Sequence, residues 1–178
     1  MRARKRVQNS GPGPHSGPMP DGAERAYVAG LRLLARRELA EAQLRARLTK
    51  RKFHQDDIDL AIGRLRREHA LDDRRTALAC ARTELRVRHR GRARIIRQIE
   101  ALGIARELAR EAVAEVFAGV DETELLEQAL DRRLRHQVKL QDPAAVRRVH
   151  RYLVGQGFDP AGVTALLRRR RAAIDETL

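Results

Sequence analysis

The stretch that decides the fold is RIIRQIEALGIARELAREAV, residues 94–113. Apolar residues recur every three or four positions on both sides of Gly103, a spacing typical of amphipathic helices. A glycine directly after such a period suits the left-handed residue at which many helices end. The stretch therefore predicts a helix, a tight turn and a second helix.

The same apolar pattern occurs three times along the chain, which identifies an internal repeat. The first copy consists of Leu44, Leu48, Phe53, Ile58, Ile62 and Leu65. A shift of 51 residues gives Ile95, Ile99, Ile104, Ala109, Val113 and Val116. A shift of 105 residues gives, for the first five positions, Val149, Leu153, Phe158, Val163 and Leu167. The residue before the third member is Lys52, Gly103 or Gly157, so each copy places a turn at the same point.

Each repeat is predicted to hold three helices, because a further helical period precedes each copy of the pattern. We expect helices near residues 24–38, 40–51, 55–68, 73–88, 91–102, 105–118, 122–138, 143–155 and 160–171. Asp72 and Asp121 are placed to cap helix starts, and the pairs Asp142-Pro143 and Asp159-Pro160 combine a capping aspartate with a proline at the first helical position.

The predicted fold class is all-α, an elongated and curved array of three tandem three-helix repeats after a disordered tail. The tail covers residues 1–22, which are basic, rich in Gly, Pro and Ser, and without an apolar period. The repeats are expected over residues 23–70, 71–119 and 120–178. Stacked units of this size share their interfaces, so the array should be extended rather than spherical.

Composition supports this fold and limits the functions. Aromatic residues make up 3% of the chain and tryptophan is absent, so Leu, Ile, Val and Ala must form the core. The single cysteine, Cys80, excludes an internal disulfide and fits a reducing compartment. No long uncharged apolar stretch predicts a membrane span or signal peptide. We therefore expect a cytoplasmic protein.

Charge points to an anionic partner. The formal net charge is +14, and 34 of the 38 basic residues are arginines, although a GC-rich genome would also produce that excess. Residues 74–97 hold nine arginines and one acid, residues 107–131 hold eight acids, and residues 143–171 hold seven arginines and one acid. Ordinary helix surfaces mix the two signs at neighbouring positions, so this segregation favours an interaction surface.

No group of residues predicts catalysis, a cofactor or a metal site. The six histidines form no HExxH motif, and Cys80 lies among alanines as a small buried residue would. The stretch around Gly103 also suggests a DNA-binding helix-turn-helix. Its second helix, however, carries Glu107, Glu111 and Glu115 in a stripe that would face phosphates. We therefore expect a protein that is not an enzyme and does not read bases in the major groove.

Three segments carry a family resemblance. They are LRLLARRELAEAQLRARLTKRKF (residues 31–53), ALDDRRTALACAR (residues 70–82) with the arginine-rich turn after it, and the turns LGI (102–104) and QGF (156–158). Together they resemble the RecX family over about residues 24–171. The chain departs from the family pattern at Thr76, where an aromatic residue is common, at Gly91-Arg92, where Gly-Pro is common, and at Leu102, where lysine is common.

The resemblance implies a regulatory protein that binds the RecA–DNA filament. It implies inhibition of RecA ATPase, strand exchange and co-protease activity in recombination and the SOS response, by a monomer that also touches single- or double-stranded DNA nonspecifically. The alternative is a nonspecific nucleic-acid-binding protein that acts through its basic surface. The low aromatic content argues against a platform on which bases stack.

The predicted partner-binding residues are arginines of the central repeat: Arg74, Arg75, Arg88, Arg90, Arg92, Arg94 and Arg97. The nearest acids in the sequence are Glu84 and Glu100, so most of residues 88–97 should be unpaired within the chain. On this basis, alanine at positions 88, 92, 94 and 97 should barely change stability while reducing filament binding. The alternative is that these arginines only keep the protein soluble.

Overall fold

The computed structural model describes residues 21–135, 140 and 142–175, and within them every regular element is a helix. The helices are α1 (Asp21–Leu34), α2 (Glu41–Lys50), α3 (Gln55–Arg67), α4 (Asp73–Arg86), α5 (Arg92–Glu100), α6 (Arg106–Phe117), α7 (Glu122–Leu134), α8 (Pro143–Gly155) and α9 (Pro160–Asp175). The prediction of an all-α chain is confirmed.

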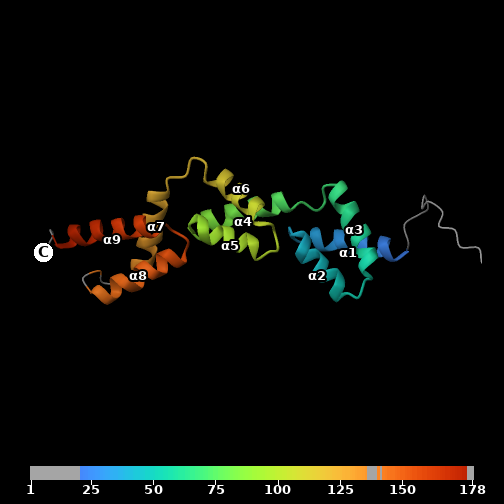
Figure 1. Ribbon diagram of the computed structural model, residues 1–178, viewed down its shortest axis with the longest axis horizontal. Coiled ribbons are helices and arrows are strands. Elements are labelled where there is room, and N and C mark those ends of the chain that lie inside the picture. The colour runs from blue at the N-terminus through green and yellow to red at the C-terminus, as the bar shows by residue number, and fades with distance from the viewer. Residues whose placement is uncertain (1–20, 136–139, 141, 176–178) are drawn as a thin grey trace, which may run out of the picture.

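The helices pack in three groups, which we call the first unit (α1–α3), the second unit (α4–α6) and the third unit (α7–α9). Figure 1 shows the units in a row, with the second unit between the other two. The molecule is therefore elongated, as the repeat pattern predicts. The residues at which one domain ends and the next begins remain a prediction.

The helix bounds follow the prediction closely, with the largest differences at the two ends. The first helix begins at Asp21 rather than residue 24 and ends at Leu34 rather than residue 38, so Asp21 and Gly22 are helical and not part of a tail. Carboxylates of Asp21 and Glu24 in the first turn favour this earlier start, because they complement the helix dipole. The last helix continues to Asp175. The rest of the predicted tail and residues 136–138 of the predicted seventh helix lie outside the described residues.

The repeated apolar positions form the core. All but two members of the three series are buried, and the exceptions, Phe53 and Val116, are half-buried. Phe117 is buried beside Val116. The first unit has a core of its own, whereas the second and third units share one continuous core, which Ala40 of the first unit also joins. The period read from the sequence therefore identifies the buried face of each helix.

The predicted turns and caps are also confirmed. Lys52, Gly103 and Gly157 are all left-handed, with φ of 64°, 88° and 93°. The side chains of Asp72, Asp121 and Asp142 accept hydrogen bonds from the first turns of α4, α7 and α8. The side chain of Asp159 accepts one from the N–H of Gly162 at 2.8 Å. Across the described residues, no helix is long and apolar enough to cross a membrane.

Candidate partner-binding surface

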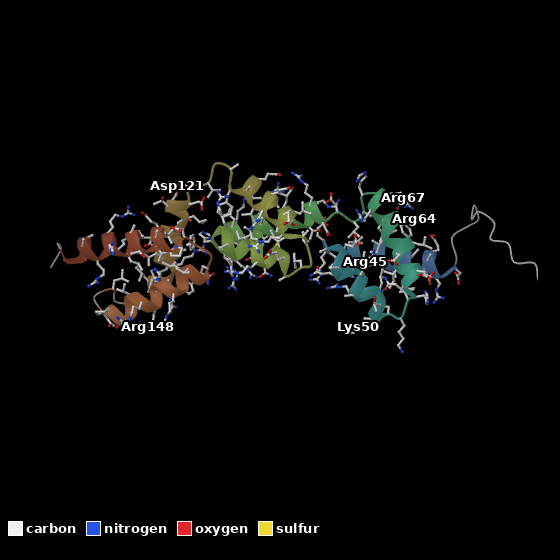
Figure 2. All side chains as sticks on the ribbon, in the orientation of Figure 1. Arg45, Lys50, Arg64, Arg67, Asp121 and Arg148 are labelled. Carbon is white, nitrogen blue, oxygen red and sulfur yellow. The ribbon has the colours of Figure 1, made fainter. Side chains whose placement is uncertain are left out.

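All seven predicted arginines lie in the second unit or in the turn between its first two helices. Arg74 and Arg75 are in the first turn of α4, Arg88 and Arg90 follow its end, and the other three lie on α5. This unit occupies the middle of the row in Figure 1. Figure 2 shows that charged side chains extend well beyond it, from Arg64 and Arg67 on α3 to Arg148 on α8. The fold thus places all seven predicted residues on one unit, at both ends of α4 and along α5, within a surface that is charged along its length.

The turn after α4 pairs two of these arginines with one buried carboxylate. The chain reverses there, with the N–H of Arg90 donating to the carbonyl of Glu84 at 3.2 Å. The guanidinium of Arg90 then pairs with the Glu84 carboxylate, and that of Arg88 lies 3.5 Å from it. The side chains of Glu84 and Arg90 are only 7% and 14% exposed. Arg90 therefore braces the turn and is too buried to serve as a surface contact.

Arg92 is also paired, across the boundary between units. Its Nε donates to Glu122 Oε1 of α7 at 2.8 Å, and its guanidinium carbon lies 4.4 Å from the centre of the Phe117 ring. The prediction that most of residues 88–97 are unpaired is wrong. The Arg88–Glu84 pair has the i,i+4 spacing of a helix and could have been expected, whereas Arg90 meets Glu84 only after the turn reverses and Arg92 meets Glu122 only after the third unit docks.

The two arginines of α4 have partners as well. Arg74 pairs with Glu115 of α6. Arg75 donates to both carboxylate oxygens of Glu38, at 2.8 and 3.3 Å, and to the carbonyls of His69 and Ala70 at 3.0 and 3.1 Å. Because Glu38 precedes α2, Arg75 links the second unit to the first. Both side chains are about half exposed, at 58% and 44%.

The segregation of charge along the sequence is reduced in space. Four acids of the run from residue 107 to 131 pair with arginines of the two basic runs: Glu115 with Arg74, Glu122 with Arg92, Glu127 with Arg169 and Asp131 with Arg170. The charged runs alone therefore do not locate an interaction surface, and that part of the prediction stays a prediction. Much of that pattern is intramolecular pairing between helices.

Arg94 and Arg97 differ from the other five predicted residues. Neither has a carboxylate partner among the residues that the structure describes, although one guanidinium nitrogen of Arg94 lies 3.5 Å from the Gly155 carbonyl. Arg97 is exposed and Arg94 half-buried, while Ile95 and Ile99 on the other side of α5 are fully buried. The pair therefore lies away from the apolar face of α5.

The sequence analysis did not single out Arg82 and Arg86 of α4. Both are exposed and have no carboxylate partner within the described part of the chain. Their positions four residues apart in a basic run were the available signal. We call Arg82, Arg86, Arg94 and Arg97 the unpaired arginines. Guanidinium groups of this kind bind either carboxylates or phosphates.

The site offers charge rather than reactive groups. Burial, reinforced by the negative charge of Glu84, raises the pKa of the Cys80 thiol, which disfavours the thiolate needed for nucleophilic attack. Burial also lowers the pKa of His89, with a further contribution from Arg132. In the described ranges no group of three or more His, Cys, Asp and Glu is placed to hold a metal. On α6, Glu107 and Glu111 are exposed, and their negative charge would repel the phosphates of a DNA major groove.

The chain is similar in sequence and fold to proteins of one known family. The family model described as RecX, first three-helix domain, matches residues 26–65. A regulatory protein RecX from Thermus thermophilus is 41% identical over 138 residues, covering 78% of this chain and 86% of that protein. One from Syntrophotalea carbinolica is 31% identical over 137 residues, covering 76% and 90%. The crystal structure of RecX from Lactobacillus salivarius matches with a TM-score of 0.72 at 18% identity, covering 84% and 96% of the two chains, and shows a shared fold.

Proposed function

The chain belongs to the RecX family of regulatory proteins, and from this we propose that it binds the RecA–DNA filament and inhibits RecA. The inhibited activities are ATP hydrolysis, strand exchange and co-protease activity in recombination and SOS repair. The protein acts by binding, as a cytoplasmic monomer without a cofactor or chemistry of its own. DNA adds nonspecific contacts to those made with RecA.

The observation that carries this proposal is the set of four unpaired arginines on α4 and α5, in the central unit of an elongated chain. The extended row of units suits a long, repetitive partner better than a small ligand. Most other predicted arginines are held by intramolecular carboxylates, so they contribute less free charge. The unpaired arginines can form charge-assisted hydrogen bonds with carboxylates of RecA or phosphates of the DNA.

The test is RecA ATPase activity on single-stranded DNA as a function of the concentration of this protein. We expect hydrolysis to fall and to saturate at a low ratio of this protein to RecA, since one elongated molecule covers more than one protomer of a filament. RecA must first be shown to be assembled on the DNA. An ATPase rate that then stays the same at every concentration of this protein contradicts the proposal.

A second candidate function, nonspecific nucleic-acid binding, is supported by the net charge of +14. Salt separates the two. Binding through phosphates alone weakens by roughly 10³–10⁵ between about 50 and 200 mM salt for a protein with about 6–10 phosphate contacts. A complex that also contains protein contacts should lose less. If RecA inhibition and binding to bare DNA decline in parallel as salt rises, the charge-only function is the correct one.

A further inference from the structure

The starts of the second helices of the three units are capped in different ways. The first N–H groups of any helix need acceptors from outside it. In the third unit, the Asp142 side chain accepts from the N–H groups of Ala144 and Ala145 at 2.8 and 3.1 Å, and Pro143 has no N–H to satisfy. In the other two units the capping residues are Ala40 and Gly91, and neither supplies a side-chain acceptor.

The missing acceptors come from the unit that follows. At the start of α2, the N–H of Glu41 donates to Asp73 Oδ1 of α4 at 2.8 Å. At the start of α5, the N–H groups of Gly91 and Ala93 donate to the carbonyls of Gln156 and Gly157, at 2.9 and 3.3 Å, in the turn between α8 and α9. Each following unit therefore completes the second helix of the unit before it, and of these three helices only α8 is capped from within its own unit.

Glycine allows this close approach. A Cβ on Gly157 would overlap the backbone nitrogen of Arg94, and a Cβ on Gly91 would overlap the carbonyl of Gly157. A Cβ on Gly103 would overlap Cβ of Ala42 in the first unit. At the equivalent position of the first unit, which packs against no preceding unit within the described residues, the chain has Lys52, exposed and still left-handed. Lys52 shows that the left-handed φ alone does not require glycine, so docking is what requires it at positions 103 and 157.

We propose that Gly157 and Gly91 are positioning residues for the unpaired arginines of α5. The contact between them fixes the first turn of α5, which carries Arg94, and so sets the direction of the helix that carries Arg97 in its last turn. Two side-chain contacts support the same junction: Arg92 of the first turn pairs with Glu122, and Arg132 of α7 donates to the carbonyl of Val87, between α4 and α5, at 3.3 Å. Docking of the third unit therefore sets the direction of arginines that belong to the second. This inference rests on the proposed function above.

The test compares Gly157→Ala with Gly119→Ala in the full-length protein. Gly119 is also left-handed, with φ of 84°, but a Cβ there meets no atom within 4 Å. The control therefore introduces the same backbone strain without the collision between units. We expect amide hydrogen exchange at Gly91 and Ala93 to be about tenfold faster in Gly157→Ala and unchanged in the control. Inhibition of RecA ATPase on single-stranded DNA should need about fivefold more of the Gly157→Ala protein, and no more of the control.

Each result bears on the proposal. Unchanged exchange at Gly91 in Gly157→Ala shows that the junction does not depend on the glycine contact, and faster exchange with full inhibition shows that the junction does not position the arginines. Either result overturns the inference. If Gly157→Ala fails to fold by circular dichroism, Arg132→Ala takes its place and is judged by the same two readouts. A wild-type protein without effect on RecA refutes the proposed function instead, while the exchange data still test the junction.

Discussion

The two junctions between units occupy equivalent positions in the repeat but are built from different chemistry. Side chains dominate the junction between the first and second units: the Asp73 carboxylate caps α2, and Arg75 pairs with Glu38. Backbone groups dominate the junction between the second and third units, where two N–H groups of one unit meet two carbonyls of the other. The difference shows that equivalent helix starts can be capped by a carboxylate, which titrates, in one junction and by carbonyls, which do not, in the other.

The hydrophobic cores also separate the first unit from the other two. The second and third units share a continuous core, whereas the first unit has a separate one. Separating the last two units would expose apolar surface as well as break hydrogen bonds, so we expect them to unfold together. The first unit is expected to separate more readily.

The largest effect is expected from Gly91→Ala. The added Cβ would collide with backbone atoms of Gly157, which no side-chain movement can relieve. We expect a loss of about 3 kcal/mol in the free energy of unfolding, measured by chemical denaturation. Gly155→Ala is the control, because Gly155 is helical and a Cβ there meets no atom within 4 Å. The control should keep or slightly raise stability, since alanine favours a helix over glycine, and the same result for Gly91→Ala would mean that the junction can separate at no cost.

A smaller effect, which a second substitution should partly reverse, is expected at the junction between the first and second units. Gly103→Ala should cost about 2 kcal/mol, from left-handed strain and from contact with the Ala42 side chain. Because the obstacle is a side chain, Ala42→Gly in the same protein should recover part of the loss, after correction for its own cost in α2. A double-mutant cycle measures the coupling. Strict additivity would contradict the contact between Gly103 and Ala42.

Lowering the pH should distinguish the two carboxylate caps, Asp73 at the start of α2 and Asp142 at the start of α8. Burial raises the pKa of the Asp73 carboxyl, and the hydrogen bond from Glu41 only partly opposes this. The hydrogen bond from the Ala144 N–H lowers the pKa of Asp142. The folded chain therefore holds the Asp73 proton more tightly than the unfolded chain does. The stability from Asp142 persists until the pH falls through its lowered value.

As the pH falls, Asp73 should thus protonate before Asp142. Carboxyl chemical shifts followed by NMR measure both titrations, and the backbone amide of Glu41 should respond at a higher pH than that of Ala144. The Gly91 amide, which donates to a carbonyl, should not respond in that range. The reverse order for the two carboxyls would show that Asp73 is not buried against α2.

The smallest effect is expected at Lys52, the exposed left-handed residue of the first unit. Lys52→Gly removes left-handed strain but adds entropy to the unfolded chain, so we expect a net gain of about 0.5 kcal/mol. Thermal or chemical denaturation would detect it. A clear loss would indicate that the lysine side chain makes a contact that supports the first unit.

Local features were predictable from the sequence, and long-range pairings were not. The helical period, the turns at Gly103 and Gly157, and the caps at Asp72, Asp121 and Asp142 each depend on neighbouring residues, and the structure confirms them. The partners of Arg90 and Arg92 depend on a chain reversal and on the docking of another unit. Counting nearby acids therefore overestimated the unpaired charge.

The central claim is that the unpaired arginines, and not the paired ones, meet the filament. The direct test is binding of fluorescently labelled protein to RecA assembled on single-stranded DNA, for two matched double variants. Arg94→Ala with Arg97→Ala should keep its stability and weaken binding by at least about tenfold. Arg74→Ala with Arg169→Ala removes the same charge but breaks pairs with Glu115 and Glu127, so it should lose a little stability and, while folded, bind within about twofold of wild type. Equal weakening by the two variants, or stronger weakening by the second, would contradict the account.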